Sequence, residues 1–179
     1  MGCPRRAAGR RPRSRRGLVM VQRRVKCMPG KRSNCAIAHV LDIVGDRWTI
    51  LVIRDTAILG KRSFSEISAS PEHIPPSTLT TRLALLVCQK LITKTPVAGG
   101  PGRQYSYELT QRGEDFLPVL VAMLQWSARH DPDSAVPRAM RQRLERDFIG
   151  VVESFRSLAR LSHSEVVHRA SGRIKLVLR

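Results

Sequence analysis

Apolar residues recur with a helical period where the chain first looks able to pack. The first stripe, at positions i, i+3, i+4 and i+7, consists of Ile37, Val40, Leu41 and Val44. This spacing predicts an amphipathic helix that Ser33 or Asn34 can cap and Gly45 ends. The next helix, over 47–59, has Asp46 as its cap and is apolar on most sides. We therefore expect it to form the buried centre of the domain.

Two prolines introduce a helix of a different kind. A short helix from Phe64, capped by Ser63, precedes it and ends at Pro71. The stretch IPPSTLTTRLALL then runs from Ile74 to Leu86, with hydroxyl side chains and one arginine on its outward side. One face of this helix should pack on the core, through Leu79, Leu83 and Leu86.

The period changes to that of β-strands after this helix. Residues 92–97 (ITKTPV) and 104–110 (QYSYELT) favour strands, and the AGGPG sequence at 98–102 is typical of a turn. Tyr105 and Tyr107 share one face of the second strand. The pattern predicts an antiparallel hairpin with one covered side.

Helices are predicted to follow the hairpin. The first, over 111–130, contains Pro118, which should kink or restart it. Helical spacing resumes over 140–158, and 173–179 alternates enough for a short strand. Helices followed by one small antiparallel β-hairpin predict a mainly α fold, a winged helix-turn-helix. We divide the chain into a disordered basic arm, a winged helix-turn-helix domain for DNA binding and dimerisation, and a C-terminal extension of a helix and a short strand, at 1–33, 34–131 and 132–179.

Charge is concentrated at the amino terminus. The formal net charge is +18, and residues 1–32 contain 12 Lys and Arg without Asp or Glu. The remaining residues carry a net charge of +6. Such an arm indicates a polyanionic partner, with nucleic acid first and anionic lipid second, or a tail that only keeps the chain solvated.

Several classes of function are disfavoured. The chain has no long uncharged apolar stretch, so we expect no membrane span, and a twin-arginine reading of residues 14–20 fails because charges interrupt the apolar segment. We expect a cytoplasmic protein. The four cysteines and five histidines lack zinc-ligand spacing, and neither a phosphate loop nor a nucleophile–base pair is visible. We therefore expect no metal, no cofactor and no enzymatic activity.

The helix that begins near Pro76 is suited to a DNA groove. The major groove of B-DNA is about 12 Å wide and admits one helix. Small hydroxyls can approach base edges or phosphates closely, arginine can bind guanine or phosphate, and a wing can lie along the backbone. A surface of weak helix formers without such a role is the alternative. The candidate DNA-binding residues are Ser77, Thr78, Thr81, Arg82, the wing residue Arg103, and Lys61 and Arg62 in the preceding loop.

These blocks together resemble the HxlR-type winged helix-turn-helix transcriptional regulators of bacteria and archaea. The resemblance covers residues 35–130 and includes CAIAHVLDIVGDRWTILVIRD, GKRSFSEI, IPPSTLTTRLALL, YSYELTQRGEDFLPVL and QWSARH. It implies a homodimer that binds double-stranded DNA, joined through the first helix and the long helix after the wing, and no catalysis. Pro75 departs from the family, which usually has Ser there; packing of Ile74 on Leu79 can compensate for the lost cap.

A cysteine at the start of the first helix serves as a redox sensor in several family members. Cys35 occupies that position here, so we consider a response to thiol oxidation or to a small effector. An inert small residue is the alternative. The second function considered is a nonspecific nucleic-acid-binding or ribosome-associated basic protein that depends on the arm.

Overall fold

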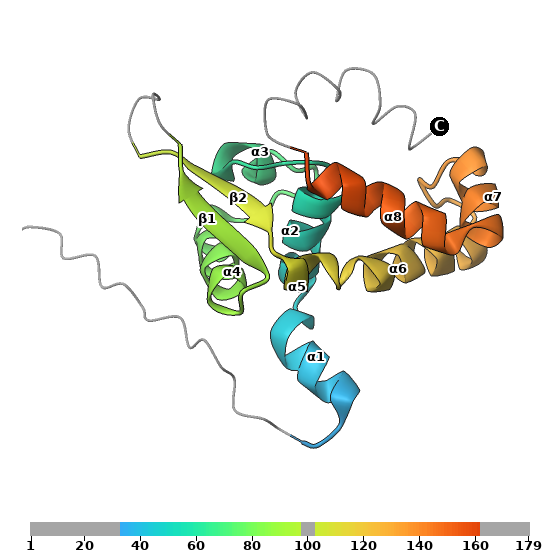
Figure 1. Cartoon of the computed structure of the whole chain (residues 1–179), viewed down its shortest axis with the longest axis horizontal. Helices are drawn as coiled ribbons and strands as arrows, with labels where there is room; N and C mark the ends of the chain where they lie inside the picture. Colours follow the sequence, from blue (N-terminus) through green and yellow to red (C-terminus); the bar gives the residue numbers. More distant parts are fainter. Residues whose placement is uncertain (1–32, 98–102, 162–179) are drawn as a thin grey trace, which may run out of the picture.

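The computed structural model describes residues 33–97 and 103–161, and they form helices with one hairpin. Figure 1 shows α2 at the centre, the hairpin and α4 towards one end, α7 at the other, and α1 projecting from the body. The elements are α1 Ala36–Val44, α2 Arg47–Ala57, α3 Phe64–Ser68, α4 Pro76–Cys88, β1 Ile92–Pro96, β2 Tyr105–Leu109, α5 Gln111–Glu114, α6 Leu117–His130, α7 Arg138–Arg146 and α8 Phe148–Ala159. The predicted order of helices and hairpin in this part of the chain is confirmed.

Helix α2 is buried as its apolar sequence predicts. Val52 and Ile53 are fully buried, and α2 contacts α4, α8 and β2. Three of the four leucines of α4 pack into the core, with Leu79 and Leu86 at 0% exposure and Leu83 at 2%. Aliphatic packing therefore fixes which face of α4 points outward.

The predicted caps define several helix starts. Asp46 Oδ1 accepts hydrogen bonds from the amides of Trp48 and Thr49 at the start of α2. Ser63 and Glu66 form a capping box on α3, with Ser63 Oγ accepting from Glu66 N. Local sequence thus sets the boundaries of these helices.

The predicted interruption near Pro118 is confirmed. Helix α5 ends at Glu114, and α6 starts at Leu117 with Pro118 in its first turn, where proline's missing N–H does not break a helical bond. The break turns the chain from the hairpin into the long helix.

The hairpin is antiparallel, with Ile92 opposite Leu109 and Pro96 opposite Tyr105. Tyr107 and Ile92 face the core and are 6% and 2% exposed. The predicted turn at 98–102 lies outside the described residues. The hairpin projects beyond α4 as a wing (Figure 1).

The C-terminal extension folds onto the same core. Its helical part is divided into α7 and α8 at Asp147, whose side chain accepts a hydrogen bond from Gly150 N. Five residues of these helices belong to the buried cluster that contains α2 and α4, namely Met140, Leu144, Val151, Val152 and Phe155. The strand predicted at 173–179 and nearly all of the basic arm lie outside the described residues.

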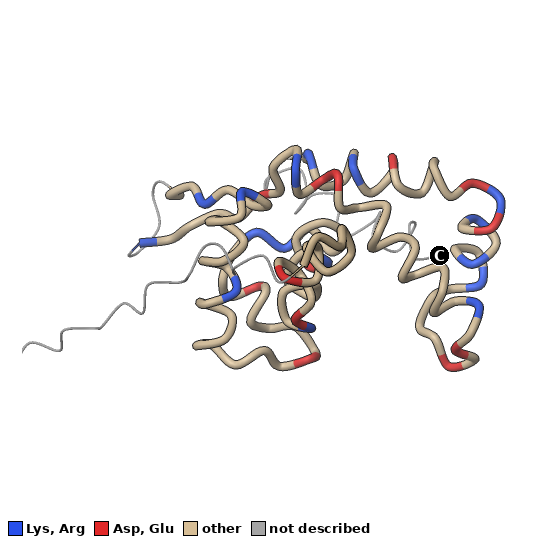
Figure 2. The backbone as a smooth tube through the Cα atoms, turned by 90° about the horizontal axis from the view of Figure 1, so that it is seen from below, with Lys and Arg blue, Asp and Glu red and all other residues tan. Residues whose placement is uncertain are grey.

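Charged residues are spread along the described chain. In Figure 2, blue Lys and Arg segments and red Asp and Glu segments occur at both ends of the molecule. Within this part of the chain, no helix is long and apolar enough to cross a membrane. Because charges of both signs are mixed, the contribution of each cation depends on its own partners.

Candidate nucleic-acid interface

The outward face of α4 carries short side chains. Ser77, Thr81 and Ala84 are exposed, and Thr78 is half-buried. Thr81 Oγ1 donates to the carbonyl of Ser77 over 2.9 Å, and Thr80 Oγ1 donates likewise to Pro76. These bonds fix the hydroxyls close to the helix and leave their lone pairs and methyl groups facing outward. The face can therefore approach a second surface closely.

The N-terminus of α4 starts without a side-chain cap. Pro75 occupies the capping position, and no described side chain bonds to the first-turn amides. Ile74, just before it, is 3% exposed and shares the core with Leu79, as expected for a hydrophobic staple. Uncapped N–H groups at a helix N-terminus favour an anion such as phosphate.

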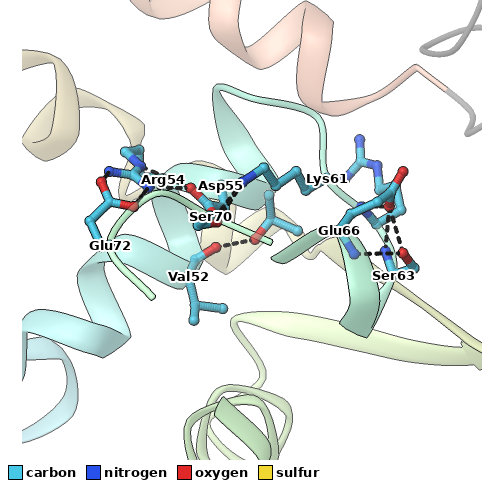
Figure 3. A network of polar contacts seen from close by, with 10 residues as sticks. Val52, Arg54, Asp55, Lys61, Ser63, Glu66, Ser70 and Glu72 are labelled. Atoms are coloured by element: carbon cyan, nitrogen blue, oxygen red, sulfur yellow. Dashed lines mark hydrogen bonds and ion pairs between the residues drawn. The ribbon is translucent and has the colours of Figure 1, made fainter. Parts of the chain in front are cut away.

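A polar network holds the turn that leads into α4. The carboxylate of Asp55 in α2 is buried and accepts hydrogen bonds from Ser70 Oγ and from Lys61 Nζ, the latter over 3.1 Å. Arg54 pairs with Glu72, with Nη2 donating to Oε2 over 3.0 Å (Figure 3). The hydrogen bond from Arg54 lowers the pKa of Glu72 to about 2. Charge-assisted hydrogen bonds therefore attach the turn between α3 and α4 to α2.

Arg82 is engaged within the protein. Its Nη2 lies 3.1 Å from Asp46 Oδ2, so the carboxylate that caps α2 also pairs with the arginine of α4. The Arg82 side chain is 28% exposed. An exposed edge remains for DNA, but contact must compete with Asp46.

The two loop cations are placed differently from the predicted phosphate contacts. Lys61 Nζ is held by Asp55 and Ser70. Arg62 is 1% exposed, and its Nη2 donates to the carbonyl of Ala159 at the end of α8 over 2.5 Å. Burial lowers the pKa of the Arg62 guanidinium. In this structure the charged groups of both residues bond to partners within the protein, and their contact with DNA stays a prediction.

The wing offers a cation at its described edge. Arg103 is exposed, just before β2. On β1, the Lys94 ammonium lies 3.9 Å from the centre of the Tyr105 ring, within the range of a cation–π contact. Arg103 is therefore an exposed cation of the wing, whereas Lys61 and Arg62 are held by partners within the protein.

Cys35 is an exposed free thiol in the capping position of α1. Its backbone N–H donates to Ser33 Oγ over 3.2 Å. No His, Cys, Asp or Glu cluster in the described ranges could hold a metal ion.

Sequence reasoning missed the partners of these cations. The Asp46–Arg82 pair joins residues of two helices, and the spacing of single residues does not reveal it. The exposed apolar residues of α6 lie on the long helix that the family resemblance expects at a dimer contact: Val119, Met123 and Trp126 are 44%, 47% and 65% exposed. Periodicity alone did not single out these three residues, because a helical stripe predicts a buried face.

Comparisons with known proteins identify the helix-turn-helix part of the chain. The model of the HxlR-like helix-turn-helix family matches residues 43–135. An uncharacterised HTH-type transcriptional regulator of Mycobacterium bovis is 34% identical over 97 residues, which cover 54% of this chain and 60% of the relative. A similarly named regulator of Synechocystis is 35% identical over 89 residues, covering 50% of this chain and 64% of the relative.

A solved structure shares the fold. The crystal structure of PA1607, described as a candidate transcription factor, matches with a TM-score of 0.51 and 33% identity, over 58% of this chain and 72% of the other. This chain spans about three fifths of the length of the mycobacterial relative. Because the family match includes α2 to α6 and more than half of the sequence, the chain belongs to the HxlR-like helix-turn-helix family of transcriptional regulators.

Proposed function

We propose that this protein is a homodimeric, sequence-specific DNA-binding transcription regulator whose α4 enters the major groove. The observation that carries the proposal is the two-sided character of α4. Leu79, Leu83 and Leu86 are buried. Ser77 and Thr81 form an exposed hydroxyl face, and the wing carries the exposed Arg103. A helix presented in this way fits the groove, and its arrangement after a short helix is that of a recognition helix.

The contacts divide into reading and positioning. Ser77, Thr78 and Thr81 meet base edges or nearby phosphates, and the amides of the first turn of α4 bind phosphate. Arg103 holds the DNA backbone from the wing. Arg82 contributes when it leaves Asp46 for the DNA.

Exposed apolar residues support the homodimer. On α1, Ile37 is 71% and Leu41 is 52% exposed, and on α6 Trp126 is 65% exposed. Large apolar side chains gathered on two helices mark an interaction surface, and a second copy of the chain would cover them. Two recognition helices about 34 Å apart would then read a pseudo-palindromic site in successive major grooves.

Oxidation of Cys35 would alter the proposed dimer interface. The thiol is exposed at the first turn of α1, one of the two helices proposed to form the dimer. Formation of a sulfenic acid or of a disulfide with the second subunit changes how the two copies meet. Replacement of Cys35 by Ser should abolish any oxidant dependence of DNA binding without changing the reduced protein.

DNA selection with the purified full chain, with and without peroxide, tests the proposal. A selected pseudo-palindrome with half-sites one helical turn apart is the expected result, and a 1:1 complex of dimer and duplex should be seen by analytical ultracentrifugation. Leu41→Glu should give monomers that bind a half-site weakly. Binding of all duplexes with equal affinity would instead favour the nonspecific nucleic-acid-binding alternative.

A further inference from the structure

The end of α8 is tied to the base of the wing by one arginine. Arg62 Nη2 donates to the carbonyl oxygens of Ala159 over 2.5 Å and of Leu161 over 3.4 Å. These carbonyls belong to the C-terminal end of α8, where helical acceptors lack partners and a cation is favourable. Arg62 therefore caps a helix that follows it by almost one hundred residues.

The backbone of the same residue connects to the DNA-binding elements. Its carbonyl accepts a hydrogen bond from Tyr107 N of β2 over 2.7 Å, and its N–H donates to Glu66 Oε2 over 2.9 Å. Glu66 is the capping-box residue of α3. One residue thus joins the wing, the first helix of the helix-turn-helix and the last described helix.

A second tie holds the same end of α8. Arg160 donates to the carboxylate of Glu114 in α5, with an Nη2–Oε2 distance of 2.6 Å, and Glu114 is 6% exposed. Helix α5 directly follows β2. The C-terminal end of α8 is therefore bound both to Arg62, which pairs with β2, and to α5, which follows β2.

Arg62 is a poor choice if only stability is considered. It is 1% exposed, and its Nε and Nη1 are buried without a hydrogen-bond partner among the described residues. Burying incompletely paired guanidinium nitrogens is unfavourable, and well-packed apolar replacements of buried ions are often neutral or stabilising. What an apolar residue cannot supply is the directional bond to α8.

From these contacts we infer that Arg62 is a positioning residue for DNA binding, through which the α7–α8 extension sets the position of the wing relative to α4. The inference rests on the proposed function, because it concerns how that DNA surface is held. The extension lies beyond the segment matched by the family, which ends at residue 135. In this proposal α8 holds the wing through Arg62, on a side of the wing that does not contact the DNA.

The test compares Arg62→Met, Arg62→Lys and the control Arg141→Met in the full chain. Arg141 also donates to carbonyls, those of Val136, Ala128 and Ser134, but these lie far along the chain from the wing. The probe is a duplex carrying the site selected by the wild-type protein, and thermal unfolding is measured in parallel. Arg62→Met should keep or raise the melting temperature and weaken binding by about tenfold, a usual size for coupling between contacting elements.

Three readouts separate positioning from general support of the fold. Arg62→Lys, which can still donate to Ala159, should recover most of the affinity, and Arg141→Met should bind as the wild type does. Arg103→Ala should lose less affinity in the Arg62→Met background than in the wild type, because the wing is already displaced. The amide of Tyr107 should exchange with solvent faster in Arg62→Met.

Other outcomes overturn the inference. A folded Arg62→Met variant with wild-type affinity would contradict it. So would an affinity loss that is proportional to the drop in melting temperature and additive with the loss from Arg103→Ala. If Arg62→Met does not fold, Glu114→Gln loosens the same end of α8 and must show the same non-additivity with Arg103→Ala. Absence of any operator preference in the wild-type chain would instead refute the proposed function.

Discussion

Asp46 pairs with Arg82, a candidate DNA-binding residue. Replacing Asp46 should therefore affect DNA binding although Asp46 itself is not a candidate contact. Asp46→Asn removes the negative charge 3.1 Å from Arg82 Nη2. Asparagine caps a helix about as well as aspartate, so the bonds to the amides of Trp48 and Thr49 can persist. We expect this substitution to strengthen operator binding, because Arg82 is released for DNA.

The magnitude follows from the exposure of the pair. The side chains of Arg82 and Asp46 are 28% and 36% exposed, and ion pairs of this kind contribute at most about 1 kcal/mol. Release of Arg82 can therefore improve the operator affinity by no more than about fivefold, since 1.4 kcal/mol corresponds to tenfold. Arg82→Ala should act in the other direction and weaken operator binding by about 1–3 kcal/mol, more on the selected site than on random DNA.

Fluorescence anisotropy with the selected duplex and with a scrambled duplex measures both effects. The double variant should bind like Arg82→Ala alone, because Asp46 acts through Arg82. Urea unfolding of Asp46→Asn provides the control for helix capping. If Asp46→Asn binds more weakly than the wild type while unfolding normally, Arg82 serves the protein as a strut and does not contact DNA.

Three further predictions test the core, the turn and the arm. Leu79→Ala should lower the free energy of unfolding by about 2–5 kcal/mol because Leu79 is fully buried. Thr81→Ala, at an exposed position, should change it by less than about 0.5 kcal/mol and still weaken operator binding. Urea denaturation and fluorescence anisotropy on both variants measure the two effects. The Arg54 contact lowers the pKa of Glu72 to about 2 from an ordinary 4.5, so its stabilisation is complete above that ordinary value and disappears as the pH falls through 2. Urea unfolding should therefore show Glu72→Gln less stable than the wild type at pH 7, by under about 1 kcal/mol, and equally stable below pH 2. Deletion of residues 1–32, which carry 12 basic residues, should flatten the salt dependence of binding and keep operator preference; a preference that disappears with the arm contradicts the assignment of reading to α4.

Much of the fold could be predicted because its determinants are local. The caps at Asp46 and Ser63 and the stripe of leucines on α4 each depend on residues within about one or two helical turns. The restart of the helix near Pro118 is equally local, since proline lacks the N–H that a helix interior requires. Patterns of this range are visible in a single sequence.

The roles of the cations were beyond such patterns because each depends on a distant partner. Lys61 meets an acid in α2, Arg82 meets the cap of α2, and Arg62 meets carbonyls at the end of α8. A charge in a loop near a recognition helix looks the same in sequence whether it faces solvent or a helix end. Tertiary packing decides between the two, and only Arg103 of these four is left exposed.

The use of these cations inside the fold changes where DNA affinity must come from. The described surface of α4 offers hydroxyls, first-turn amides and a restrained Arg82, all of which act at short range and depend on fit. Long-range attraction scales with net charge, and the sequence concentrates that charge in residues 1–32. Recognition and attraction would then reside in different parts of one chain. Varying the salt concentration should alter the attraction, and it should leave the ranking of DNA sequences by affinity unchanged.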